Sequence, residues 1–206
     1  MRNTVWIVGL TLLLPLAASA QKAPRAEFFG GYSYLYVRGY AAEESLLSPG
    51  SGGSQGTTFA FPSFGLNGWN GSVAANATSW LGGEADVSGF YGMPTRTVAR
   101  TAVTLGMREY NYLFGPRFTY RHGRWAPFAH ALFGGARASV LIGAPEVLQP
   151  IRVVETKFAM AFGCGVDLRV YHRLAVRLVQ GDWLTTSFVG GHQKNIRLSA
   201  GLVFRM

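Results

Sequence analysis

The sequence predicts an all-β fold: an eight-stranded antiparallel up-and-down β-barrel that spans a membrane. Eight segments alternate apolar with polar or small residues, in five of them the apolar face carries no charge across its middle, and short links alternate with longer ones. Successive side chains of an extended strand point to opposite faces. Each segment also has the length needed to cross a bilayer, which is about 9–11 residues at a 45° tilt.

The first residues have the pattern of a secretory signal peptide. Arg2 starts a basic region, residues 5–16 form an apolar run, and residues 18–20 are small. This run is too short for a membrane-spanning helix. We therefore expect residues 1–20 to be removed and residues 21–206 to form one barrel domain. Cys164 is the only cysteine, so no disulfide within the chain is expected.

The chain has few charged residues for its length. Charged residues make up 14% of the sequence, against roughly 25% in soluble domains. The net charge of +9 could suit a nucleic-acid partner, but the arginines are scattered singly through strand-like segments. No nucleic-acid partner is therefore expected.

The predicted strands are set by a period of two in the pattern of apolar residues. Two irregularities stand out. Pro116 removes a ladder hydrogen bond from the fourth strand, and Asp182 is out of phase with Arg177 in the seventh, which requires a bulge or a rim position. The eight strands are expected near residues 26–37, 66–77, 81–92, 107–120, 126–139, 157–169, 174–186 and 195–206.

The links between strands favour a membrane barrel over a soluble one. Those at 78–80, 122–124 and 171–173 are short, whereas the first link, near 38–65, is long. Outer-membrane barrels have short periplasmic turns and longer extracellular loops. Aromatic residues also stand where the girdles at the membrane interfaces are expected, namely Tyr34, Tyr36, Tyr91, Tyr120 and Trp125. A soluble periplasmic barrel or sandwich is the alternative.

The last strand carries a family resemblance. The final eight residues fit the carboxy-terminal assembly signal of the OmpA-type small outer-membrane β-barrels in their barrel-only form, through Ser199, Gly201, Phe204 and Met206. Met206 departs from the aromatic residue with which that family usually ends. The resemblance implies contact with the outer-membrane assembly machinery, with outer-membrane lipid and with lipopolysaccharide, as a monomer without a cofactor.

The barrel interior is expected to hold paired charges. With eight strands it is just wide enough to be filled by side chains, and buried charges must be paired and hydrogen-bonded. A salt-bridge plug is the expectation, and a small gated pore is the alternative. The five acids and six bases expected to point inward are Glu27, Glu84, Asp86, Glu109, Asp167, Arg117, Arg137, Lys157, Arg169, Arg177 and Arg197.

No catalytic, cofactor or metal site is expected. No pair of His or Cys residues has the spacing of metal ligands, and Glu84 and Asp86 fit an interior ion network better than a general acid and base pair. The expected function is non-enzymatic, in envelope integrity or in surface interaction through the extracellular loops. A lipid-modifying enzyme that transfers or removes acyl chains of lipid A is the alternative.

The first long loop is the candidate ligand surface. It combines two acidic residues with apolar ones, and long loops carry function more often than barrel walls do. The residues concerned are Glu43, Glu44, Leu46, Leu47, Phe59, Phe61 and Phe64.

Overall fold

The computed structural model describes residues 24–38, 40–44, 57–61, 63–93, 95–98, 101–143, 151–186 and 193–206. Every regular element in these ranges is a β-strand. The described part of the chain contains no helix with the length and apolar character to cross a membrane. Residues 1–20, Leu46 and Leu47 lie outside the described residues.

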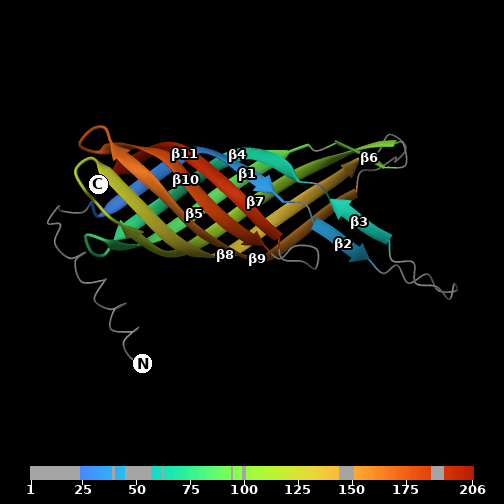
Figure 1. Cartoon of the computed structure of the whole chain (residues 1–206), viewed down its shortest axis with the longest axis horizontal. Helices are drawn as coiled ribbons and strands as arrows, with labels where there is room; N and C mark the ends of the chain where they lie inside the picture. Colours follow the sequence, from blue (N-terminus) through green and yellow to red (C-terminus); the bar gives the residue numbers. More distant parts are fainter. Residues whose placement is uncertain are drawn as a thin grey trace, which may run out of the picture.

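Eight strands close into one antiparallel barrel (Figure 1). Each strand pairs with its neighbours along the barrel, and β1 pairs with β11 to complete the ring. The predicted fold class is confirmed, and the strand bounds agree with the expected ranges to within a few residues at most ends. The strands are β1 (Ala26–Val37), β4 (Phe64–Asn76), β5 (Leu81–Gly92), β7 (Thr101–Thr119), β8 (Trp125–Gly143), β9 (Ile151–Arg169), β10 (Leu174–Thr186) and β11 (Gln193–Arg205).

The two ends of the barrel differ. At the short-turn end, residues 77–80, 120–124 and 170–173 connect the strands, and β1 begins where β11 ends. At the long-loop end, β2 (Tyr40–Glu44) pairs with β3 (Thr57–Phe61), and β6 (Thr95–Val98) pairs with the start of β7 (Figure 1). The three short strands of the long-loop end were not predicted. In outer-membrane barrels the short turns face the periplasm.

The β1–β11 seam removes the free edges of the sheet. Its register runs from Glu27 opposite Arg205 to Tyr36 opposite Ile196. Gly31 faces Gly201 across this seam, and a methyl group on Gly31 would overlap the carbonyl oxygen of Ala200. Paired glycines therefore permit the close approach of the first and last strands, and no unpaired edge is left on either.

The outer face is apolar and the inner face is polar. Along β11 the exposed residues are Ile196, Leu198, Ala200, Leu202, Phe204 and Met206, as predicted, while Arg197 and Ser199 are buried. Phe114 on β7 is 70% exposed. A belt of this kind is what lipid requires and what soluble proteins avoid, so it argues against the soluble alternative.

Outward-facing charge is confined to one end of the barrel wall. Among the described strand residues, the exposed cations in the outward phase are Arg108, Arg137, Arg152 and Lys194, all toward the long-loop end. The five aromatic residues predicted as girdles are all exposed.

The two irregular strands are accommodated differently. Across β7 and β8 the register is unchanged from Phe114 opposite Phe133 to Arg117 opposite His130, so Pro116 interrupts the ladder without an inserted residue. In β10 the register with both neighbours shifts after Arg177, as a β-bulge does. This bulge brings Arg177, Gln180 and Asp182 to the same inner face.

Two clusters of apolar side chains are buried inside the barrel. The larger cluster lies toward the long-loop end and includes Leu35, Leu66 and Phe90, and the smaller one toward the short-turn end consists of Phe29, Ala175 and Val203. The charged residues below the larger cluster and around the smaller one form the candidate site.

Candidate functional site: the interior ion network

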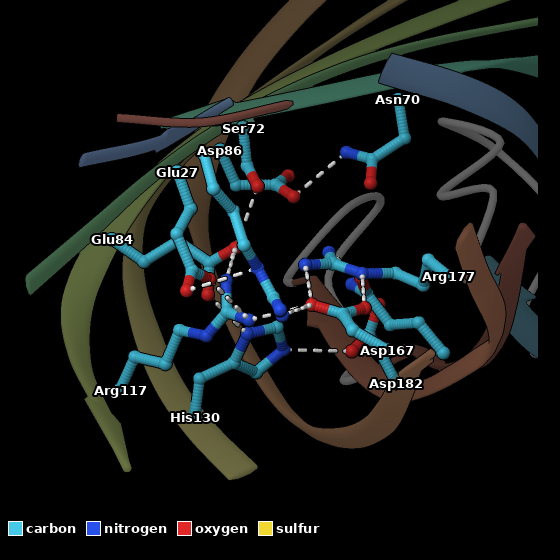
Figure 2. Close-up of polar contacts among 12 residues, drawn as sticks. Glu27, Asn70, Ser72, Glu84, Asp86, Arg117, His130, Asp167, Arg177 and Asp182 are labelled. Atoms are coloured by element: carbon cyan, nitrogen blue, oxygen red, sulfur yellow. Dashed lines mark hydrogen bonds and ion pairs between the residues drawn. The ribbon is translucent and has the colours of Figure 1, made fainter. Parts of the chain in front are cut away.

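The ion network crosses the barrel interior, with side chains from several strands in contact (Figure 2). Every barrel strand except β4 supplies an ionic residue, and Arg121 lies in the turn after β7. Strand β4 supplies the hydrogen-bonding residues Asn70 and Ser72. The members of the network are Glu27, Glu84, Asp86, Arg117, Arg121, His130, Asp167, Arg177, Asp182, Arg197 and Arg205.

Arg117 joins carboxylates from three strands. Its Nη2 lies 3.3 Å from Glu27 Oε2 and 3.2 Å from Asp167 Oδ2, and its Nη1 lies 3.6 Å from Glu84 Oε1. The guanidinium also stacks 4.0 Å over the ring centroid of Phe128, a cation–π contact. Three strands are thus tied to β7 by one side chain.

Arg177 forms a second centre beside the first. Its Nε donates to Asp167 Oδ1 at 2.8 Å and its Nη1 donates to Gln180 Oε1 at 2.6 Å. Figure 2 shows the Asp167 carboxylate between the guanidinium groups of Arg117 and Arg177. Arg177 also lies 4.1 Å over the ring of Phe29, so the apolar cluster of the short-turn end supports it.

His130 bridges two carboxylates. Its Nδ1 lies 2.8 Å from Glu84 Oε2 and its Nε2 lies 2.8 Å from Asp182 Oδ1. A carboxylate accepts hydrogen bonds, and a protonated imidazole can donate from both nitrogens. The ring therefore acts as a double donor that connects β5 to β10.

Arg197 links the network to the last strand. Its Nε lies 2.6 Å from Asp182 Oδ2, and its Nη1 lies 2.7 Å from Asp86 Oδ1 and donates to Ser88 Oγ at 3.1 Å. Asp86 also accepts from Asn70 Nδ2 at 2.7 Å. These bonds are charge-assisted, which makes them stronger than neutral ones.

The carboxylates and arginines of the ion network balance, and a protonated His130 leaves it with one positive charge. It contains five carboxylates and five arginines, with His130 in addition. Arg117 and Arg177 are 1% exposed and Arg197 is fully buried. Buried charges are tolerated when they are paired and hydrogen-bonded in this way.

The structure brings together seven of the eleven residues predicted for the interior. Glu109 is buried as well but lies apart, and among the described residues it has no cation within ion-pair distance. The seven are Glu27, Glu84, Asp86, Arg117, Asp167, Arg177 and Arg197.

The prediction is wrong for Arg137, whereas Lys157 and Arg169 are in the predicted inward phase but lie outside the packed interior. Arg137 is exposed and in the outward phase of β8, where alanines and glycines on both faces leave little contrast between them. Lys157 is in the inward phase but too near the long-loop end, where its side chain is 44% exposed and its Nζ pairs with Glu155 Oε1 at 2.9 Å. Arg169 is in the inward phase at the opposite rim and is also exposed.

Four members of the ion network were not predicted as such. Asp182 was recognised only as out of phase, because the bulge that turns it inward has no clear sequence signal. His130 stands between Ala129 and Ala131 in an apolar strand, so it was predicted to pack in the barrel wall. Arg121 and Arg205 share the phase of predicted inward residues, and that phase was the available signal.

The geometry of the network suits a structural role. Its histidine and carboxylates are buried and already bonded to one another, so a substrate has no access to them. No group of His, Cys, Asp or Glu in the described part of the chain could hold a metal ion. Cys164 lies alone on the exposed face.

Comparison with known proteins identifies the fold. No family model and no curated protein matches the sequence. Ail, the attachment invasion locus protein of Yersinia pestis, in complex with the heparin analogue sucrose octasulfate, is 13% identical, with 87% of this chain and 99% of that chain covered and a TM-score of 0.54. Neisserial surface protein A is 13% identical over 87% and 97%, with a TM-score of 0.51.

A third solved structure belongs to an enzyme. It is the outer membrane protease OmpT from Escherichia coli, 10% identical over 93% of this chain and 100% of that chain, with a TM-score of 0.50. At such identities the likeness establishes the fold alone, which is that of the small outer-membrane β-barrels. The narrower resemblance to the OmpA-type family stays a prediction.

Proposed function

We propose that this protein is a closed, non-enzymatic outer-membrane barrel that serves envelope integrity or surface interaction through its long-loop end. The ion network is the observation that supports this proposal. It places the guanidinium groups of Arg117, Arg177 and Arg197 across the interior at 1% exposure or less. An eight-stranded barrel has little interior space beyond what such side chains fill.

An open state would require these charges to separate inside the barrel. Leaving one partner of a buried pair uncompensated costs about 3–5 kcal/mol. Arg117 alone pairs with three carboxylates, so a path past it requires several buried ion pairs to break together. A steady open state is therefore not expected.

Conductance in planar lipid bilayers tests the closure. Wild-type protein is expected to give no steady current, whereas Arg117→Ala, which removes the side chain between Glu27, Glu84 and Asp167, is expected to raise the frequency of opening. Arg137→Ala is the matched control because Arg137 faces outward. A steady current through wild-type protein would overturn the closed-barrel proposal.

The non-enzymatic part of the proposal is supported by the burial of the network. The fold also occurs in a protease, so the test must measure activity directly. Mass spectra of lipid A from cells with and without the gene are expected to be identical, as are peptide-cleavage rates of purified protein and of a detergent blank. An altered acyl pattern would favour the lipid-modifying alternative.

Two further proposals concern the export of the protein and its assembly into the outer membrane. We infer that residues 1–20 are cleaved as a signal peptide and that Ser199, Gly201, Phe204 and Met206 are recognised by the outer-membrane assembly machinery. Phe204 on β11 and Met206 directly after it are both exposed, so both side chains are accessible. Amino-terminal sequencing of the exported protein tests the first inference, and a protein that retains residues 1–20 would contradict it. Recovery from the soluble periplasm without detergent would contradict the location in the outer membrane.

The outward cations suit a membrane with phosphate-rich lipid on one side. Arg108, Arg137, Arg152 and Lys194 face outward toward the long-loop end, which is the extracellular end in outer-membrane barrels. Contact with lipopolysaccharide phosphates at that level would satisfy their charge, and monomers in such lipid are the expected state. Native mass spectrometry of the protein in lipopolysaccharide-containing nanodiscs would count both the lipids and the protomers.

Surface interaction is supported by the extension of the long-loop end beyond the barrel. Strands β2 and β3 form a hairpin within the first long connection (Figure 1). A solved structure of Ail, with the same fold, holds a sulfated sugar analogue. The test compares the adherence of bacteria that carry the wild-type gene with that of bacteria whose gene lacks residues 41–60. Equal adherence of the two strains on all surfaces would argue against a role in surface interaction.

A further inference from the structure

Arginines surround the mouth of the barrel at its short-turn end. A cavity of about 620 Å³ opens there. Five arginines line it, together with His172 and Trp125. The five are Arg121, Arg124, Arg169, Arg173 and Arg205.

The backbone brings these arginines together on the inner side. The amide of Arg169 donates to the carbonyl oxygen of Arg124 at 2.8 Å, and the amide of Arg205 donates to that of Arg173 at 2.8 Å. Residues directly opposite each other in an antiparallel pair point to the same face. Arg205 is buried inside the barrel, so Arg173 shares its inward phase. Arg169 is two residues from the buried Asp167, so Arg169 and the opposed Arg124 are in the inward phase as well. Gly123 makes the tight turn before Arg124 with a φ of 59°, a conformation that glycine adopts at no steric cost.

The mouth has positive charge in excess. Arg121 and Arg205 belong to the ion network, where carboxylates and arginines already cancel. Arg124, Arg169 and Arg173 have no acidic partner within ion-pair distance in the described part of the chain. They add three positive charges, and a terminal carboxylate on Met206 would lower this sum by one.

Buried donors at the mouth also lack acceptors. Nε of Arg121 is buried without a hydrogen-bond partner among the described residues. Nε and Nη2 of Arg205 form no hydrogen bond there either, and lie at the longer ion-pair distances of 3.5 Å from Glu27 Oε1 and 3.7 Å from Asp167 Oδ2. The Arg205 side chain is only 10% exposed. Buried donors in native proteins are nearly always satisfied, so this mouth is suited to an anion that supplies several acceptor oxygens.

Phosphate is the anion that fits these groups best. Arginine forks bind phosphate oxygens in pairs, and an excess of two or three charges matches a multiply charged phosphate. Tyr120, Trp125 and Tyr171 are exposed on the same rim, and such aromatic residues lie at the headgroup level of membranes. We propose that the short-turn mouth binds a multiply charged phosphate group, free in solution or on an anionic lipid headgroup.

Two binding measurements on the protein recovered from outer membranes test this. In the first, calorimetry in a non-ionic detergent measures the affinity for inorganic pyrophosphate at low and high salt. In the second, native mass spectrometry counts lipids retained from nanodiscs made of zwitterionic lipid with or without cardiolipin. Binding of pyrophosphate assigns a soluble phosphate site, and retention of cardiolipin alone assigns a lipid headgroup site.

The variant R124Q/R173Q removes two charges without touching the ion network. It is expected to weaken pyrophosphate binding or cardiolipin retention at least tenfold, and R169Q, a second variant, to weaken it less. The matched control R108Q/R152Q removes two exposed cations at the long-loop end and is expected to bind as wild type does. Attraction between charges should also weaken as salt is raised.

Two results would overturn the inference. One is wild-type protein that neither binds pyrophosphate nor prefers cardiolipin, and the other is an R124Q/R173Q variant that binds as tightly as R108Q/R152Q. This inference goes beyond the closed-barrel proposal, because a barrel that conducts no ions can have an empty mouth. The conductance measurement can therefore contradict the closed-barrel proposal without affecting the phosphate-site proposal, and the binding measurements can do the reverse.

Discussion

Arg197 is the side chain whose loss should most disturb the barrel. It is fully buried on β11 and its Nε and Nη1 lie 2.6 and 2.7 Å from Asp182 and Asp86. Arg197→Met keeps much of the length and apolar stem of the side chain and removes its charge. Asp182 would keep two other hydrogen-bond donors, from His130 and Gln180. Asp86 would keep only the neutral amide of Asn70.

The magnitude follows from the carboxylate left behind. One uncompensated charge in a protein interior costs about 3–5 kcal/mol, so R197M should lower the free energy of unfolding by that amount. R197M/D86N removes the stranded charge as well and should recover about 2 kcal/mol of the loss, a coupling typical of contacting residues. Asp86 is only 1% exposed, so little water can screen its charge.

Equilibrium urea unfolding in phospholipid vesicles, followed by tryptophan fluorescence and by heat-modifiable gel mobility, measures these differences. The control is R137M, because Arg137 was expected inside from sequence but faces outward. Its effect should stay within about 0.5 kcal/mol, as for ordinary surface changes. Equal losses of stability in R197M and R137M, or no recovery of stability when D86N is added to R197M, would show that Asp86 does not depend on Arg197.

Three further predictions concern single side chains. His130→Leu leaves two carboxylates without their shared donor and should lower the free energy of unfolding by about 3 kcal/mol or more, seen as an earlier urea midpoint; an unchanged midpoint would contradict the bridge. Gly31→Ala places a methyl group against the β1–β11 seam and should cost about 1–3 kcal/mol. Gly30→Ala, where nothing lies within 4 Å, should cost less than about 0.5 kcal/mol in the same assay, and equal costs would show that the seam is not tight. Phe204→Ala should lower the amount of folded protein in the outer membrane more than Leu202→Ala, which also removes an outward side chain of β11; equal yields would argue against an assembly signal.

Strand position and phase could be predicted wherever the two faces differ clearly. In β11 one face is apolar without interruption and the other holds Arg197 and Ser199, so its inner and outer residues were predicted correctly. In β8 alanine and glycine occur on both faces, and the phase of Arg137 was wrong. Alternation predicts the inner and outer faces of a strand only when one face is polar and the other apolar, and alanine and glycine do not distinguish the two.

Height along the barrel axis could not be predicted. Lys157 and Arg169 are in the inward phase of β9 as expected, yet they lie beyond opposite ends of the packed interior. Between them, Asp167 meets Arg117 and Arg177. A period of two identifies the face of a residue but carries no information about which layer of the barrel it reaches.

By itself the sequence determined the fold class, the eight strands and the inward placement of most ionic residues, because alternation is a local property of an extended chain. Only the tertiary structure decided which charges meet. Arg197 pairs with Asp86, 111 positions away in the chain, through the closure of the ring. Asp182 reaches His130 because a bulge in β10 rotates it inward. The stagger of closed strands and the position of a bulge are set by packing around the whole barrel, so no single strand could reveal these partners.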